Sequence, residues 1–267
     1  MIICDFHNHT DFSADCETPA EKMIEKAIEL GLSYLCITDH MDPDMQFPGM
    51  DFTFDLEKYF SKHKEWRDTY QHKIQILTGI ELGLQPHIAK DLSDVLAAGT
   101  YDFVIGSVHV IDHIDPYFKE YWDGKTEFQG ILRYYENILE CLDAYTDFDV
   151  FGHLDYVVRY GPTQDKSYSY HAYKEIIDEI LRKLIANHIG LELNTAGLKY
   201  GLSFAHPQIE VLKRYRELGG EIITVGSDGH KPEHLAYEFH KVPSILKEAG
   251  FEYYTIFKNR KPEFIKL

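Results

Sequence analysis

The chain has 267 residues, 44% of them hydrophobic and 27% charged, the composition of an ordinary globular protein. Acidic residues outnumber basic ones by 44 to 27, and a net charge of −17 disfavours binding to nucleic acids and anionic membranes. The sequence contains no apolar run of bilayer length and no signal-peptide pattern. The four cysteines form no CxxC pair, so we expect reduced thiols in a cytoplasmic protein, with residues 1–267 as one domain.

Short apolar segments that suit buried β-strands alternate with amphipathic segments along the chain. Seven segments are predicted as strands: 2–6, 34–38, 74–80, 103–108, 148–152, 190–193 and 222–226. Residues 253–257 are a weaker eighth candidate. The amphipathic pattern predicts helices over residues 20–27, 173–185 and 211–218. The motif Thr18-Pro19-Ala20-Glu21 predicts a capping box at the start of the first of these helices.

The regular alternation predicts an α/β protein whose parallel strands are joined by helical crossovers. A closed barrel and an open doubly wound sheet both satisfy this pattern. No glycine-rich phosphate loop follows the first strand, which favours the barrel. In β/α barrels the active-site residues come from the C-terminal ends of several strands, so polar side chains at these positions are the candidates for the site.

Histidines and carboxylates gather at the predicted strand ends. Eight of them lie at or just after such an end: His7, His9, His40, Glu81, His109, His153, Asp228 and His230. Residues i and i+2 of a strand face the same side, so His7 with His9, and Asp228 with His230, are expected to converge. One histidine alone would more often be a structural hydrogen-bonding residue, but the whole set suits zinc, iron or manganese.

The remaining histidines have simpler explanations. Seven lie on or beside predicted helices, where surface or end-cap roles are expected: His63, His72, His87, His171, His188, His234 and His240. His206 precedes Pro207 at a predicted helix start. His113 follows the fourth strand, in a segment rich in aromatic and acidic residues that could cover the site, and stays open as a substrate contact.

Taken in order, these motifs resemble the polymerase and histidinol phosphatase (PHP) family. The resemblance covers essentially the whole chain and is carried by six motifs: His7-Asn8-His9, Thr38-Asp39-His40, Gly79-Ile80-Glu81, Ser107-Val108-His109, Gly152-His153 and Ser227-Asp228-Gly229-His230. Residues 151–161 and 191–198 resemble the histidinol-phosphatase branch. The resemblance implies a distorted (β/α)7 TIM-like barrel that holds two or three divalent metal ions.

The resemblance also implies a ligand set. His7, His9 and Asp228 would hold one ion, and Glu81 would bridge it to a second ion that His109 and His153 complete. Asp15, His40 and His230 would hold a third ion. Several branches of the family have histidine in place of Asp15. Because a carboxylate is a harder ligand than imidazole, iron and manganese remain alternatives to zinc.

By the same resemblance the reaction would be hydrolysis of a small phosphate monoester, most closely L-histidinol phosphate in histidine biosynthesis. We hypothesise attack on phosphorus by a metal-bridging hydroxide, in a site that its three ions leave net positive. Arg159 would grip the phosphate and act with Glu81 and Asp228 in catalysis. Asn194, at the end of the sixth strand, could contact substrate or orient a metal ligand, or could simply turn the chain. His113 is a further candidate for substrate contact. Asp42 and Asp115 are loop carboxylates that could meet an amine.

Three other functions fit parts of the pattern. A relative could act on another phosphoester such as a nucleotide, although the acidic charge disfavours a polymeric nucleic acid. A metal-dependent amide or lactone hydrolase would use a similar barrel and similar ligands. A non-catalytic metal module would be expected to have lost some ligands, whereas all nine positions here hold competent donors.

Overall fold

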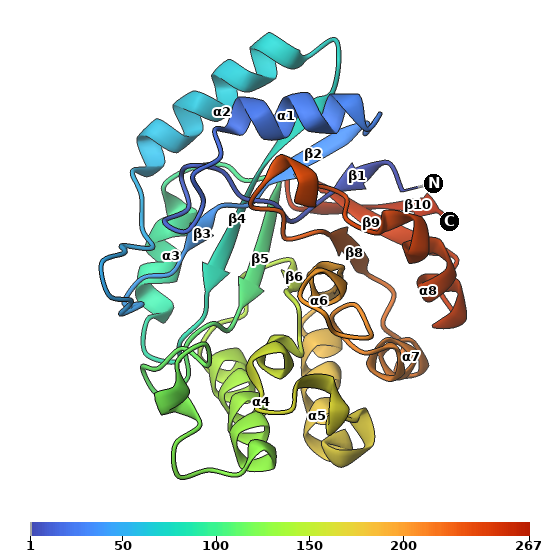
Figure 1. Ribbon diagram of the computed structural model, residues 1–267. Coiled ribbons are helices and arrows are strands. Elements are labelled where there is room, and N and C mark those ends of the chain that lie inside the picture. Colours follow the sequence, from blue (N-terminus) through green and yellow to red (C-terminus); the bar gives the residue numbers. More distant parts are fainter. Residues whose placement is uncertain (1) are drawn as a thin grey trace.

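The computed structural model describes residues 2–267, and its core is an eight-stranded parallel sheet in the order β1-β2-β4-β5-β6-β7-β8, with β3 paired to β4. The strands are β1 Cys4–Asp5, β2 Tyr34–Ile37, β3 His40–Met41, β4 Gln75–Gly83, β5 Phe103–Ser107, β6 Val150–Phe151, β7 Gly190–Asn194 and β8 Ile223–Gly226. Figure 1 shows the strands gathered at the centre of the molecule and the helices around them.

The two edges of this sheet meet and close it into a barrel. The Phe6 amide donates a hydrogen bond of 3.0 Å to the Val225 carbonyl, and Asn8 forms a parallel bridge with Gly229. Closure removes both unpaired edges. The prediction of a distorted (β/α)7 barrel is therefore confirmed, and the open doubly wound alternative is wrong.

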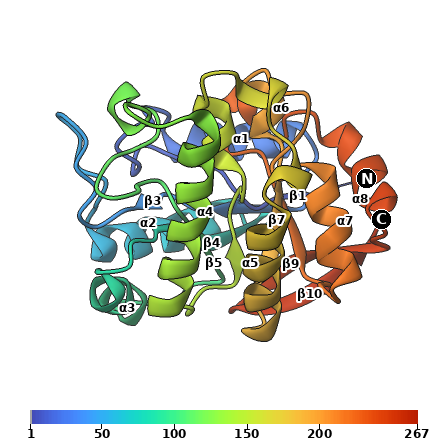
Figure 2. The ribbon, with the colours of Figure 1, turned by 90° about the horizontal axis from the view of Figure 1, so that it is seen from below.

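The helices cover the outside of the barrel and bury their apolar stripes against the strands (Figure 2). They are α1 Ala20–Glu29, α2 Leu56–Tyr70, α3 Ala89–Ala97, α4 Glu127–Ala144, α5 Lys174–Ala186, α6 Ala196–Lys199, α7 Ile209–Glu217 and α8 Val242–Glu248. The three predicted helices correspond to α1, α5 and α7. Within residues 2–267, no helix combines the length and apolarity that a membrane span requires.

The predicted capping box at α1 does not form. The helix begins at Ala20 after Pro19, and no side chain caps it. The Thr18 hydroxyl instead donates to the backbone carbonyl of His230 at 2.8 Å, and the Glu21 carboxylate accepts from the Trp66 indole at 2.9 Å. These tertiary partners replace the local pairing, so Thr18 ties the start of α1 to the segment after β8.

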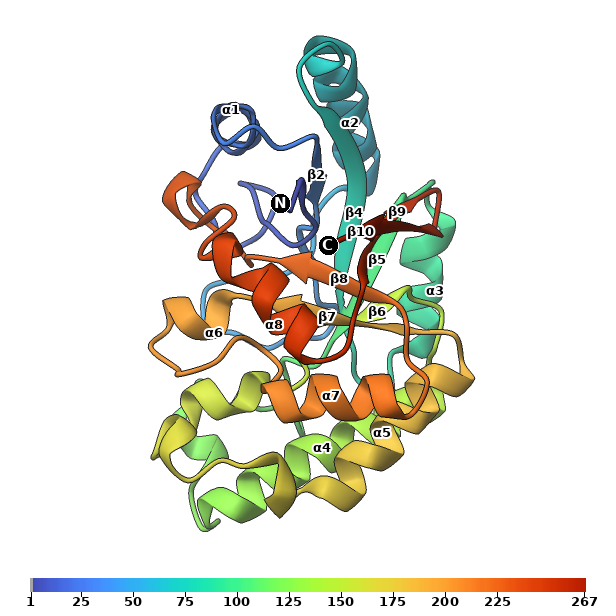
Figure 3. The same cartoon turned by 90° about the vertical axis from the view of Figure 1, so that its right-hand side faces the viewer.

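A C-terminal hairpin closes the end of the barrel opposite the predicted site. It consists of β9 Tyr253–Lys258 and β10 Lys261–Lys266, paired antiparallel (Figure 3). The Thr255 hydroxyl accepts from the Ile223 amide at the start of β8, and Asp102, just before β5, accepts from the Asn259 amide at 3.1 Å. The eighth candidate strand therefore exists but lies outside the barrel sheet.

Phe103 joins the barrel interior to this hairpin. Its fully buried ring lies 5.2 Å, centroid to centroid, from Phe6 and also from Phe257. Phe103→Ala should lower the free energy of unfolding by about 3–5 kcal/mol, because it leaves a cavity between three strands. Urea denaturation at a fixed zinc concentration measures this loss. Phe264→Ala, at a half-exposed ring of β10, is the matched control, and equal losses in both variants would contradict the packing described.

Candidate metal centre

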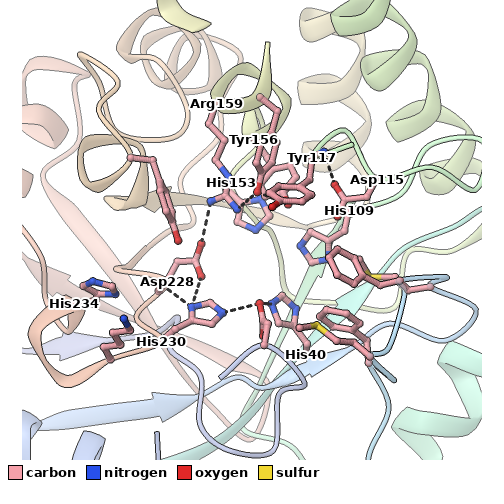
Figure 4. Close-up of a pocket in the computed structure, with 18 of the residues that line it drawn as sticks. His40, His109, Asp115, Tyr117, His153, Tyr156, Arg159, Asp228, His230 and His234 are labelled. Atoms are coloured by element: carbon pink, nitrogen blue, oxygen red, sulfur yellow. Dashed lines mark hydrogen bonds and ion pairs between the residues drawn. The ribbon is translucent and has the colours of Figure 1, made fainter. Parts of the chain in front are cut away.

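The structure brings all nine predicted ligands together at the C-terminal rim of the barrel, with the Glu81 carboxylate at the centre of the group. Figure 4 shows five of them, His40, His109, His153, Asp228 and His230, where they face the pocket. Five imidazoles surround its two oxygens. The nitrogen-to-oxygen distances are 3.1 Å for His7 Nε2, 3.5 Å for His9 Nε2 and 3.1 Å for His40 Nδ1 to Oε2, and 3.3 Å for His109 Nε2 and 3.0 Å for His153 Nε2 to Oε1. Glu81 thus lies between the imidazoles of the proposed ligand groups, where the resemblance predicts a bridging carboxylate.

The strands explain this convergence. β4 extends to Gly83, three residues beyond the predicted end, so Glu81 lies inside the strand and in register with His40 of β3. The prediction missed β3, which is only two residues long. His7 and His9 flank Asn8, whose bridge to Gly229 keeps the strand alternation beyond the end of β1. Both imidazoles therefore face the same point, as predicted.

Asp228 and His230 also meet, but not for the predicted reason. β8 ends at Gly226, and Asp228 has a left-handed backbone, with φ +51°, rather than strand geometry. Its amide donates to the His7 carbonyl at 2.7 Å, which holds this costly conformation in place. Asp228 Oδ1 lies 3.3 Å from His9 Nε2, and His230 Nε2 lies 3.2 Å from Asp15 Oδ2.

The donor atoms fit metal ions better than they fit one another. Despite these short contacts, five buried atoms that face the cluster form no hydrogen bond: His7 Nε2, His9 Nε2, His40 Nδ1, Glu81 Oε2 and His230 Nε2. Leaving so many polar atoms unsatisfied would be very costly unless cations bind them. The donor atoms are also close enough to share ions. Within each of three groups they lie within 4.8 Å of one another: His9-His40-His230, His7-His9-Glu81 and His7-His153-Asp228.

The electrostatics of the cluster keep its central carboxylate ionised. Burial by itself raises the pKa of Glu81, but the fields of His7, His40 and His109 outweigh burial and hold this pKa well below its usual range. The pKa of Asp228 is likewise held well below its usual range, against the effect of burial, by its contact with His9 and by nearby charges. Both carboxylates are therefore available as anionic ligands at neutral pH.

Arg159 lies beside this cluster, as predicted, and is enclosed by aromatic rings. It comes from the short 3-10 helix Tyr156–Tyr160, and its guanidinium carbon lies 4.4 Å from the ring centroids of both Tyr156 and Tyr200. Arg159 Nη1 is 3.9 Å from Asp228 Oδ2, and its buried Nε has no partner. Cation–π contacts of this kind hold a guanidinium in place without using up its hydrogen-bond donors.

A pocket of about 610 Å³ opens above the cluster and joins it to Arg159. Metal-centre residues His40, His109 and Asp228 form its floor. Another part of its lining is aromatic and thioether, beside the buried carboxylate of Asp115, and comprises Met45, Phe47, Phe52, Tyr117 and Tyr160. A small anion with an attached polar or aromatic body would fit this combination.

Comparison with known proteins agrees with this geometry. Residues 5–196 match the PHP domain family. The chain belongs to the PHP family. A curated histidinol-phosphatase from Lactococcus lactis is 36% identical over 266 residues, which covers 96% of this chain and 95% of that protein.

Solved structures agree with this assignment. The crystal structure of the histidinol phosphate phosphatase from Lactococcus lactis, complexed with zinc, L-histidinol and phosphate, is 34% identical, has a TM-score of 0.88, and covers 97% of this chain and 98% of that chain. A structure from Listeria monocytogenes, 21% identical with a TM-score of 0.76, covers 89% of this chain and 99% of that chain and shares the fold.

Behind the predicted ligands lie two carboxylates, Glu192 and Asp42, for which the sequence predicts no supporting role. Glu192 Oε1 is 2.7 Å from His7 Nδ1, while its Oε2 accepts from the His153 amide at 2.9 Å. Asp42 Oδ1 is 2.7 Å from His109 Nδ1. A carboxylate beside Nδ1 directs the Nε2 lone pair of a histidine toward the metal. A glutamate inside an otherwise apolar strand was the signal that could have revealed Glu192.

Glu192→Gln should weaken zinc binding, or lower turnover at limiting zinc, by about 10–100-fold. Three donors face this carboxylate, from His7, His153 and Asn194, and an amide group would turn its own NH₂ against one of them. Activity measured against buffered free zinc tests this. Glu179→Gln on the exposed side of α5 is the control, and an unchanged zinc requirement for Glu192→Gln would contradict the role.

Two predicted substrate contacts lie elsewhere in this PHP barrel. Asn194 is fully buried behind His7, donates to Glu192 Oε2 at 3.1 Å, and does not line the pocket. Its position favours the alternative role of orienting a ligand. His113 is exposed and also lies outside the pocket lining. Of the histidines expected at the surface, His63 is buried in α2, and His234 lines the pocket.

Proposed function

We propose that this protein hydrolyses L-histidinol phosphate to L-histidinol and phosphate, a step of histidine biosynthesis. The observation that carries the proposal is a nine-donor cluster directly beside the partly buried, positively charged Arg159. The similar Lactococcus lactis protein, whose crystal structure contains zinc, L-histidinol and phosphate, supports the choice of alcohol. The acidic net charge and the limited volume of the pocket favour a small substrate over a nucleic acid.

The ligand set would hold three ions. His7, His9 and Asp228 would bind the first, Glu81 would bridge it to a second completed by His109 and His153, and the remaining donors Asp15, His40 and His230 would bind the third. Divalent ions supply Lewis acidity there: they lower the pKa of water to about 7 and neutralise phosphoryl charge. Zinc suits the predominance of imidazole, and Asp15 would also suit iron or manganese.

The protein's own residues would bind and orient the substrate. The Arg159 guanidinium, desolvated by its tyrosines, would donate to phosphoryl oxygens, which a charged fork does with good geometry. Asp115 would meet the amine of the alcohol portion. Its Oδ1 accepts from the Tyr117 amide at 2.8 Å, so the carboxylate is fixed on the pocket wall. The aromatic wall around Phe47 and Phe52 would exclude water from the reacting groups.

Phosphate release from a panel of small monoesters tests the proposal. The zinc-loaded protein should show its highest kcat/KM on L-histidinol phosphate, above a nucleoside monophosphate, phosphoserine and p-nitrophenyl phosphate, and should not cleave a lactone or amide at a comparable rate. Higher kcat/KM on a nucleotide would favour the other phosphoesterase function. Preferential hydrolysis of a lactone or amide would overturn phosphatase activity itself.

Removal of metal should abolish this activity. Dialysis against a strong chelator should reduce turnover at least about 1,000-fold, because both the nucleophile and the charge neutralisation depend on the ions. Added zinc should restore turnover, and iron or manganese can be compared with it in the same assay. Full activity in protein shown by elemental analysis to be free of metal would contradict the role of the cluster.

A further inference from the structure

A second group of metal-type donors lies outside the catalytic cluster and is built from Asp44, His87 and His113. One carboxylate oxygen and one nitrogen from each imidazole lie within 4.8 Å of one another. His87 Nε2 is 2.7 Å from Asp44 Oδ2, and the His87 and His113 ring centroids are 5.1 Å apart. All three residues are exposed.

Three separate loops supply these donors. Asp44 follows β3, His87 lies between β4 and α3, and His113 follows β5. No single helix or strand fixes the spacing of these residues. The two histidines and the aspartate are close together because three separate loops converge at this point. Two imidazoles and one carboxylate, with a fourth position open to water, make a donor set that Zn²⁺ binds readily.

The loops are held in position independently of any ion. His113 lies at the tip of a tight hairpin in which Ile111 and Ile114 exchange backbone hydrogen bonds of 3.0 and 2.9 Å. The adjacent Asp112 is fixed to Arg133 of α4 by two contacts, of 2.9 and 2.6 Å. Such anchoring reduces the ordering cost of binding a ligand at the tip.

The other two donors are also tied together. The Gln85 side chain donates to the Pro43 carbonyl at 3.2 Å, which joins the loop of Asp44 to the loop of His87. The same loops continue into the pocket wall: Phe47 follows Asp44, Tyr117 follows His113, and their ring centroids are 6.2 Å apart. An ion bound by the three donors would therefore link the loops that carry Phe47 and Tyr117, which both line the substrate pocket.

We propose that Asp44, His87 and His113 form a separate binding site for a divalent transition-metal ion, with Zn²⁺ as the best fit, that stabilises the pocket-wall loops. This site uses none of the nine donors of the catalytic cluster, and the proposal does not depend on the identity of the substrate. It also gives His113, which lies away from the pocket, a role other than substrate contact.

Metal counting tests the site. The holoenzyme is dialysed against buffered Zn²⁺ and its zinc measured by elemental analysis, for wild type, His87→Ala/His113→Ala and the control His171→Ala/His240→Ala, whose histidines are also exposed. Wild type and control should bind one zinc equivalent more than the double variant. Equal zinc content in all three proteins across the dialysis series would overturn the proposal.

Hydrogen exchange tests whether this ion stabilises the pocket-wall loops. Raising free Zn²⁺ through the range in which the extra equivalent binds should slow amide exchange in residues 43–52 and 110–117 of the wild type. The His87→Ala/His113→Ala protein, which keeps the catalytic donors, should not show this slowing. The same slowing in wild type and variant would assign the effect to the catalytic cluster. It would contradict the proposal that an ion at Asp44, His87 and His113 stabilises these loops.

Discussion

Replacing Glu81 by glutamine is expected to lower turnover by at least about 1,000-fold, equivalent to about 4 kcal/mol of transition-state stabilisation. The carboxylate lies within 3.5 Å of five imidazoles, which come from all three of the proposed ligand groups. Glutamine keeps the shape but removes the charge and one oxygen. Its NH₂ group cannot bind a cation, and would face either metal-binding nitrogens or the Ser107 hydroxyl.

Phosphate release and bound zinc should be measured on the same Glu81→Gln preparation, beside Glu57→Gln, an exposed residue in the first turn of α2. The variant should lose metal and activity together while its circular dichroism stays that of the folded barrel. Full turnover with a full zinc complement would remove Glu81 from the bridging position and, with it, the arrangement proposed for the cluster.

The second large effect is expected at Arg159. Arg159→Ala should raise KM by about 10–100-fold, the equivalent of one or two charge-assisted hydrogen bonds to phosphate, with a smaller change in kcat. Arg159→Lys should recover only part of this loss, because an ammonium group cannot form the forked contact or stack between Tyr156 and Tyr200 in the same way.

Steady-state kinetics on L-histidinol phosphate separate the two parameters, and inorganic phosphate as a competitive inhibitor gives a second measure. The Arg159→Ala protein should bind phosphate more weakly by a similar factor, whereas Arg182→Ala, at an exposed position on α5, should leave both values unchanged. An unaltered KM together with unaltered phosphate inhibition would exclude Arg159 from the phosphate site.

The sequence was most informative where local pattern and global topology agree. Buried parallel strands are continuous apolar segments, and their C-terminal ends must share one rim, so His109 and His153 could be placed without knowing the tertiary contacts. Asp15 could be placed only through the family resemblance, because it lies in a loop whose course depends on contacts with His230.

The errors arose where tertiary contacts override local preference. Thr18 looked like a helix cap, but the His230 carbonyl offers its hydroxyl a better-placed acceptor. Asn194 looked like a pocket residue because it ends a strand, yet Glu192 turns its amide inward. The aromatic enclosure of Arg159 was also missed. It combines Tyr156 with Tyr200, which lies far along the chain, and no short-range pattern reveals such a pairing.

A crystal structure of the zinc-loaded protein with an anomalous difference map at the zinc edge would test the metal centre most directly. We expect three peaks around the Glu81 carboxylate, each about 2.0–2.2 Å from its nitrogen and oxygen donors and all separate from the site proposed at Asp44, His87 and His113. A map from fully active protein that shows no peak between His7, Glu81 and His153 would contradict the account.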